Sequence, residues 1–358
     1  MTFKYETIRE RMAGLPRQTS TREREIEWIV SQRLGVSRGH RGHVEIFIGG
    51  PELHPTLAAL RDNIDYQTWY GQQQHQFNAN RLLLPSADYF EQAAAFICIE
   101  LIDAGVEHDP AGAFASKEPI IDVWLQQLQL TNQAVLGLAG ELLVFEALMS
   151  IAPTDRLLDL LASWLGYTHS TRDFEIPPIG IEIKTTTRGT SRHHINNPDQ
   201  LELGRTSGGT AETNLFLASI GLQWADQPEG AWTLPLVVDR LLEHLNKLAP
   251  SQQKEAHTEL LSKIEQYGGD NKLGYNHLAM RDSPRYNRPF GVEFARLYDV
   301  GDPAIKVLRL SDLSGFDNVD PGSVSYQVRL PRKVNGDLNP QNGFQTAASH
   351  VLTLAGWT

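Results

Sequence analysis

Cysteine is nearly absent from this chain, which excludes several kinds of site. Among the 358 residues there is one cysteine, Cys98, so the chain alone forms neither an internal disulfide nor a cysteine-rich zinc site. Cys98 stands in the apolar run AAFICIELI, which is typical of a buried side chain rather than a nucleophile. We therefore expect neither redox nor thiol chemistry.

Long apolar runs are also lacking. The best candidates, residues 93–102 and 136–147, fall short of the ~20 residues that cross a bilayer, and they contain Glu100 and Glu141. The N-terminal sequence MTFKYETIRERMAGLPRQ carries charges where a signal peptide has an apolar stretch. These absences predict a cytoplasmic protein with no membrane partner.

The motifs of several common enzyme classes are missing too. The sequence has no GxxxxGK[ST] phosphate loop, no GxSxG nucleophile elbow and no GxGxxG motif after a strand. We therefore expect no nucleotide-driven motor in this chain, and such an activity would come from a separate ATPase partner.

The charge balance is acidic, with 32 Lys and Arg against 43 Asp and Glu and a net charge of -11. Such a balance argues against a protein that coats nucleic acid without selectivity. It leaves local contact with DNA open.

The order of predicted elements begins with a mixed region over residues 1–130, which could recognise DNA. The capping-box spacing from Ser20 to Glu23 predicts a helix over residues 21–34, and the alternation in HVEIFIG then predicts a strand. The Gln- and Asn-rich residues 51–86 are interpreted as loop, with one further strand at RLLLP. Helices are predicted over residues 87–103, 117–130 (capped by Ser116) and 133–150.

Residues 131–225 form the predicted core. After a helix in DRLLDLLASWLG, the sequence RDFEIPPIGIEIKTTT is typical of a β-hairpin with a Pro-Pro-Ile-Gly turn. The segment NLFLASIGLQW, residues 214–224, predicts a third strand. Residues 226–358 would complete the fold, with helices over 234–248 and 251–267 and a β-rich end containing strands at GVEFARLY, AIKVLRL and SVSYQVRL.

The hairpin carries the most informative charged residues. Asp173 begins its first strand, and Glu182 and Lys184 lie two apart on the second, so the pleat points both side chains to one face. These groups are costly to desolvate unless a divalent cation shared by Asp173 and Glu182 neutralises the acids. Hard oxygen ligands favour Mg²⁺, with Mn²⁺ as the alternative. Lys184 beside the ion could hold or help to deprotonate a water that attacks phosphorus, which is phosphodiester hydrolysis.

The same residues have a simpler interpretation. Exposed strands often alternate apolar and charged residues, and E-x-K occurs frequently by chance. The apolar Ile181 and Ile183 on the opposite face favour a central strand instead. Glu141, within an otherwise apolar helix, either reaches the same site or forms a salt bridge elsewhere.

These motifs, within residues 136–201, resemble the PD-(D/E)XK nuclease superfamily, and more closely a group of bacterial PD-(D/E)XK motif proteins found among restriction and phage-defence genes. The strings that carry the resemblance are GELLVFEAL, WLG, DF and IEIKTTT, followed by a segment ending in DQL. The resemblance implies an α/β fold, α+β overall, in which a restriction-endonuclease-like core has a mixed central sheet flanked by helices.

The resemblance also implies roles for individual residues. Asp173, Glu182 and Glu141 would be metal ligands, and these three with Lys184 would be the catalytic residues. Arg172 stands where the superfamily name has Pro, a change expected to matter little because Pro there only shapes the backbone. The candidates for DNA contact are Gln200, Arg188, Arg192 and His194, for each of which a capping or surface role is the alternative.

Taken together, the sequence predicts a Mg²⁺-dependent DNA endonuclease, a type II-like restriction or phage-defence enzyme. Cleavage of both strands would favour a homodimer, and other defence-system proteins are expected as partners. Two alternatives stay open: a non-catalytic nuclease-fold subunit that binds DNA or protein in a defence complex, and a nuclease acting on RNA or modified DNA.

Overall fold

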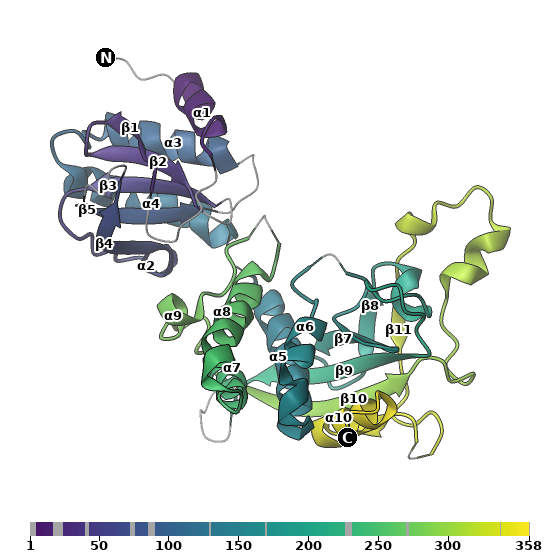
Figure 1. The fold of residues 1–358 in the computed structure, drawn as a ribbon. Helices are drawn as coiled ribbons and strands as arrows, with labels where there is room; N and C mark the ends of the chain where they lie inside the picture. The colour runs from purple at the N-terminus through teal and green to yellow at the C-terminus, as the bar shows by residue number, and fades with distance from the viewer. Residues whose placement is uncertain are drawn as a thin grey trace. The chain divides into compact units, whose positions relative to one another are not determined.

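The computed structural model describes residues 5–16, 24–39, 43–71, 76–84, 90–128, 130–168, 170–225, 231–269, 272–336 and 338–357. The chain forms two compact units, each described by itself (Figure 1). Unit 1 comprises Met1–Leu130 and Gly268–Gly274, and unit 2 comprises Thr131–Tyr267 and Tyr275–Thr358. Apart from Gly268–Gly274, the residues from 131 to the C-terminus therefore belong to one unit.

Unit 1 is an antiparallel sheet with helices packed on one face. The strand order is β1-β2-β3-β5-β4, with bounds Glu27–Val30, Leu34–Arg38, Val44–Gly49, Gln76–Leu84 and Ile64–Tyr70 in that order. Its helices are α1 (Tyr5–Ala13), α2 (Ala58–Asn63), α3 (Phe90–Asp103) and α4 (Pro110–Leu128). Alternate strand residues such as Ile46 and Leu82 are buried in one core with Ala94 and Leu101 of α3, as the two-residue period of a strand requires.

The predicted helix over residues 21–34 is wrong. The described part of this stretch holds β1 and the start of β2, and the predicted cap at Ser20 lies outside the described residues. The β-branched Ile29 and Val30 fit a pleated strand, and the turn after them holds Gln32 at a φ of 55°. Apolar spacing compatible with a helix was therefore overridden by strand pairing.

The interpretation of residues 51–86 as loop is also wrong, because their described part holds α2, β4 and β5; the strand predicted at RLLLP lies within β5. Strand β4 lies at an edge of the sheet and is mostly polar, so it lacks the apolar alternation of a half-buried strand. Helix α4 begins at Pro110 rather than Lys117. Ser116 does not cap it but donates its hydroxyl to the Ala113 carbonyl within the helix.

Unit 2 contains the predicted α/β core. Its main sheet has the order β12-β10-β9-β7-β6, with bounds Gln341–Asn342, Phe290–Asp299, Asn214–Trp224, Ile179–Thr186 and Phe174–Ile176 in that order. Strands β7 and β9 are parallel and the other pairs are antiparallel, so the sheet is mixed, as predicted. A separate antiparallel pair joins β8 (Arg192–Ile195) to β11 (Tyr326–Arg329).

Helices pack against one face of this sheet (Figure 1). Their bounds are α5 (Asn132–Ile151), α6 (Leu157–Ser163), α7 (Leu234–Leu245), α8 (Pro250–Gln266), α9 (His277–Met280) and α10 (Phe344–Leu354), and short 3-10 turns are η2 (Thr154–Arg156), η3 (Pro198–Leu201), η4 (Leu310–Gly315) and η5 (Pro321–Ser323). Helix α5 contacts β7, β9, α7 and α10. Although α5 is long and apolar enough to cross a membrane, 67% of its apolar 18-residue stretch is buried inside the fold. We therefore interpret it as a core helix of unit 2.

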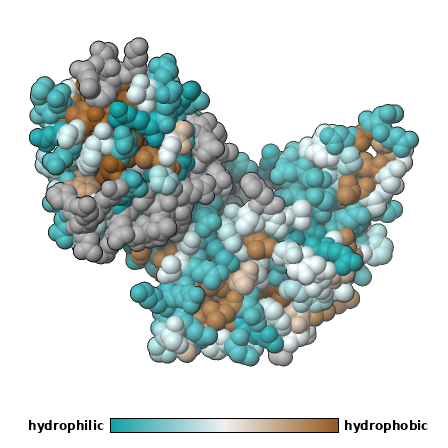
Figure 2. Space-filling view, turned by 45° about the horizontal axis from the view of Figure 1, so that its top comes forward, coloured by the Kyte–Doolittle hydropathy of each residue, from teal (hydrophilic) through white to brown (hydrophobic). Residues whose placement is uncertain are grey.

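The hairpin of β6 and β7 and the strand over residues 214–224 are confirmed. The strand predicted at AIKVLRL is wrong, because Ala304 lies in a turn, residues 305–309 belong to no strand, and Leu310 begins η4. Strand β8 and helix α10 were not predicted. Because one predicted strand is missing and α10 is the last element in the chain's described part, the C-terminal region is less rich in strands than expected. Between β10 and β11 the chain forms an arm on which Leu308, Leu310, Phe316 and Val319 are exposed, and Figure 2 shows this apolar patch at its upper right edge.

Candidate active site

The site lies where β7 loses its neighbour on one side. Strand β6 pairs with β7 only as far as Ile181, so the second half of β7 has an open edge. Asp173, just before β6, occupies this edge: its backbone N–H donates to the Ile181 carbonyl at 3.0 Å, and its Oδ2 accepts from the Ile183 N–H at 2.6 Å. The carboxylate of Asp173 is thereby fixed against the strand that carries Glu182 and Lys184.

Glu182 and Lys184 form an ion pair inside this site, with Nζ 2.6 Å from Oε1. Glu182 is 4% exposed, whereas the Lys184 side chain is 18% exposed. Gln200, in η3, binds both: its Nε2 donates to Glu182 Oε1 at 2.9 Å, and its Oε1 lies 3.5 Å from Lys184 Nζ. The structure therefore brings Gln200 to the two residues beside which the sequence placed it.

Glu141 enters the same site from α5. Both of its carboxylate oxygens are already bound, since Trp164 Nε1 donates to Oε2 at 3.0 Å and the Tyr267 hydroxyl donates to Oε1 at 2.9 Å. A methyl group on Gly166 would lie 1.8 Å from Glu141 Oε2, so glycine is required there for this carboxylate to fit. The alternative of a salt bridge to an arginine is not what the structure shows.

Burial raises the pKa of all three carboxyl groups. It raises the pKa of Glu141 to about 7, with a further contribution from the charge of Glu182. The pKa of Asp173 lies well above its usual range because the group is buried and because Glu141 and Glu182 are close. Burial also raises the pKa of Glu182, although the ammonium of Lys184 acts in the opposite direction. Acids crowded in this way are stabilised by an added positive charge.

These residues line a cleft of about 480 Å³. It is open to solvent and mostly polar, and its lining includes Thr131, Gln133, Gly137, Glu141, Gly166, Ser170, Asp173, Glu182, Lys184, Thr185, Gln200 and Tyr267. The Thr185 hydroxyl is buried and has no hydrogen-bond partner among the described residues. The cleft thus combines acids, one ammonium and an unsatisfied hydroxyl in a space large enough for small polar ligands.

The donor set fits a divalent cation only in part. Among the residues that the structure describes, no three Asp, Glu, His or Cys side chains already have the arrangement of a metal centre. Asp173 Oδ1 and Glu182 Oε2 accept no hydrogen bond from any described residue and remain available as hard oxygen ligands. Glu141 would have to give up a bond to Trp164 or Tyr267 to join them.

Arg172 has a larger role than its position in the motif suggested. Its guanidinium forms a buried ion pair with Glu212, with Nε 2.8 Å from Oε1, and donates to the backbone carbonyls of Thr171, Asp199 and Glu202. Arg172 is 3% exposed. This side chain thereby fixes the segment that carries Gln200, a role that the sequence did not predict. That the absence of Pro itself matters little stays a prediction.

The other three candidates for DNA contact lie outside the cleft. Arg188 is exposed after β7, and Arg192 and His194 are exposed on β8. Trp164 and Tyr267, which hold Glu141, were not predicted as functional. Trp164 had a signal in the WLG string, whereas Tyr267 lies 126 residues from Glu141 and nothing in its local sequence marks it.

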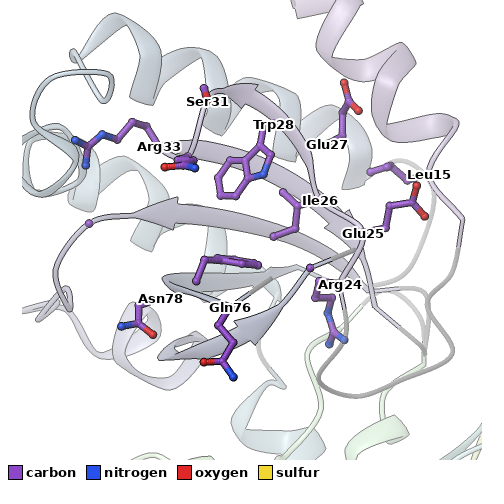
Figure 3. Close-up of a pocket in the computed structure, with 14 residues that line it drawn as sticks. Leu15, Arg24, Glu25, Ile26, Glu27, Trp28, Ser31, Arg33, Gln76 and Asn78 are labelled. Atoms are coloured by element: carbon purple, nitrogen blue, oxygen red, sulfur yellow. The ribbon is translucent and has the colours of Figure 1, made fainter. Parts of the chain in front are cut away.

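Unit 1 contains a larger cavity of about 940 Å³, shown in Figure 3. Its lining includes Trp28 and Ile26 of the sheet's open face, with Arg33, Gln76 and Asn78 at its rim. Its acids, Glu25 and Glu27, belong to one short segment, and no lysine is among the described residues that line it. We therefore place the candidate chemistry in the smaller cleft of unit 2.

Comparison with known proteins agrees with this geometry. A family model described as "Putative PD-(D/E)XK family member, (DUF4420)" matches residues 6–283. The chain belongs to this PD-(D/E)XK family. The match includes unit 1 and ends before β10, so unit 1 is a shared part of the family rather than an addition to the nuclease core. No curated protein and no solved structure matches the chain.

Proposed function

We propose that this protein is a Mg²⁺-dependent DNA endonuclease that hydrolyses phosphodiester bonds. The observation that carries the proposal is the convergence of Asp173, Glu182 and Lys184 at the open edge of β7, in a chain of the PD-(D/E)XK family. These are the three residue types that the family motif names, and they share one cleft with the buried acid Glu141.

The ion would be held by Asp173 Oδ1 and Glu182 Oε2, and Mn²⁺ would fit the same oxygens. When bound, such a cation lowers the pKa of a water molecule and offsets the charge that develops on the phosphate. Two carboxylates leave most of its coordination positions to water and to the substrate, which suits catalysis better than a closed structural site.

Lys184 would act on the reacting phosphate. Its ammonium donates to Glu182 and reaches the cleft, so Nζ can donate a hydrogen bond to the oxygen of a nucleophilic water or of the phosphate. Gln200 helps to orient Lys184, because it binds Glu182, the ion-pair partner of Lys184. Glu141, held by Trp164 and Tyr267, places a third negative charge beside the ion site and can orient water there.

The test is a nuclease assay on plasmid DNA, comparing the wild type with Lys184→Ala, each with Mg²⁺ and with EDTA. The matched control is Lys247→Ala, which removes an exposed lysine of unit 2 outside the cleft. We expect cutting by the wild type and the control only with the metal, and none by Lys184→Ala. Cutting by Lys184→Ala at the wild-type rate would refute the assignment.

The substrate and the biological setting belong to the same proposal. Unmodified DNA, methylated DNA and RNA are compared side by side, and cutting of RNA alone would move the enzyme to another substrate class. Absence of cutting on every substrate would favour the non-catalytic binding subunit.

A restriction or phage-defence role in the cytoplasm, with partner proteins that include a separate ATPase, predicts that Glu182→Ala abolishes protection of cells against phage.

One site cuts one strand at a time, so cleavage of both strands favours two sites, and we propose a homodimer with two-fold symmetry. Light scattering of the protein, with and without DNA, tests this. A monomer that nevertheless makes double-strand breaks in one binding event would contradict it.

A further inference from the structure

The antiparallel pair β8 and β11 presents one buried face and one exposed face. Toward the main sheet it buries His193, Ile195 and Val328. The opposite side, here called the ribbon face, consists of Arg192, His194, Gln327 and Arg329, all exposed. Register places Arg192 opposite Arg329 and His194 opposite Gln327, so the four side chains form one compact polar patch.

The charge of this region is opposite to that of the chain as a whole. Residues 186–197 and 324–335 contain five Arg or Lys and no Asp or Glu, whereas the chain has an excess of acids. Within the part of the chain that is described, Arg188, Arg192, Arg329 and Arg332 form no ion pair with a carboxylate. A positive patch without internal counter-charges on an acidic protein is complementary to a phosphate backbone.

The ribbon face also offers hydrogen-bond donors. Arg192 uses Nε and Nη2 to donate to Gln327 Oε1, at 2.9 and 2.5 Å. Its Nη1 and the Gln327 Nε2 have no partner among the described residues. Guanidinium and amide donors pointing outward match phosphate oxygens and the acceptor edges of guanine.

This patch is connected to the cleft by short, specific contacts. The chain leaves β8 at Ile195, and the next N–H, of Asn196, donates to Gln200 Oε1 at 3.1 Å. The same Gln200 donates to Glu182 in the cleft. On the inner side, His193 Nε2 lies 2.7 Å from Ser219 Oγ, and Ser219 is the register partner of Lys184. The ribbon is therefore attached to η3, which carries Gln200, and to β9, the neighbour of the strand that carries Lys184.

We propose that the ribbon face is the docking surface for duplex DNA and that it positions one strand at the cleft. A two-stranded antiparallel ribbon fits the major groove of B-form DNA, whose width is about 12 Å. This inference rests on the proposed nuclease function, but it concerns binding, so its failure can be separated from a failure of the chemistry.

Binding is measured by fluorescence anisotropy with a short labelled DNA duplex, using Lys184→Ala as the parent so that no strand is cut. The test variant adds Arg192→Glu and Arg329→Glu. The control adds Lys247→Glu and Lys254→Glu, which make the same charge change at exposed positions on another part of unit 2. We expect the test variant to bind at least ~10-fold more weakly and its salt dependence to fall by about 1 in log–log slope per lost phosphate contact. The control should keep both quantities.

Equal weakening in test and control variants would overturn the proposal, because it would reduce the effect to net charge. Parent-like binding by the test variant, or a parent that prefers an RNA of the same sequence, would overturn it as well. Arg192→Gln with Arg329→Gln, which removes the charges without reversing them, should give an intermediate loss and guards against a folding defect. If the wild type cuts DNA and Lys184→Ala does not, but the ribbon variants in the wild-type background cut normally at low DNA concentration, the nuclease function stands and the ribbon proposal falls.

Discussion

The buried acid Glu141 should make the stability of the metal-free protein depend on pH. Burial raises its pKa from the ordinary 4.5 to about 7. Because the folded-state pKa is the higher one, the folded protein binds the proton more tightly than the unfolded chain does. The resulting stabilisation is complete below pH 4.5 and is lost as pH rises through 7. The corresponding free energy is about 3 kcal/mol.

Glu141→Gln isolates this effect. Glutamine has nearly the same shape and keeps an oxygen for the Trp164 N–H, while its altered contact with Tyr267 shifts stability by an amount that does not vary with pH. It also removes a charge that raises the pKa of Asp173, which adds to the difference in the same direction. We therefore expect the wild type to lose about 3 kcal/mol relative to Glu141→Gln between pH 4.5 and pH 8.

The measurement is urea unfolding in EDTA, followed by far-UV circular dichroism at several pH values for both proteins. The quantity of interest is the difference between the two unfolding free energies, in which the titration of all other groups largely cancels. A second series at pH 8 adds Mg²⁺ or Mn²⁺, and the cation should restore part of the wild-type stability because it offsets the crowded charges. A difference between wild type and variant that stays constant from pH 4.5 to 8 would refute the reasoning.

Three further outcomes follow from the geometry of unit 2. Arg172→Met leaves Glu212 buried without its partner and should lower the unfolding free energy by about 3–5 kcal/mol. The double variant Arg172→Met with Glu212→Gln should recover much of this loss. Equal stability of the single and the double variant would contradict the role of the ion pair. Gly166→Ala places a methyl group against Glu141 and should lower nuclease activity strongly. The control is Gly315→Ala, at a glycine with open space around it and without a positive φ. Full activity of Gly166→Ala would show that the position of Glu141 is unimportant. Burial and the nearby Lys184 charge lower the pKa of His193 to about 4. The unfolding free energy of the wild type should therefore fall by about 3 kcal/mol as pH falls from 6.5 through 4. The unfolding free energy of His193→Gln should fall less over that range in the same urea series.

Where local signals were strong, the sequence predicted the elements of the site well. The hairpin of β6 and β7 follows from β-branched runs around a Pro-Pro-Ile-Gly turn, and the spacing of Glu182 and Lys184 assigns both to one face of a strand. The first predicted helix failed because the apolar spacing around Ile29 also suits a strand, and only pairing with β2 distinguishes the two.

The sequence by itself determined the chemistry that is available: two acids and a lysine in register on a hairpin, and an acid in an apolar helix. These assignments depend on side-chain periods of two residues or of one helical turn, which neighbouring residues impose. Tertiary structure decided which distant groups complete the site. Tyr267 reaches Glu141 across 126 residues, and Arg192 of β8 reaches Gln327 of β11 across 135. Such contacts depend on how the helices and strands pack, and no local pattern encodes them.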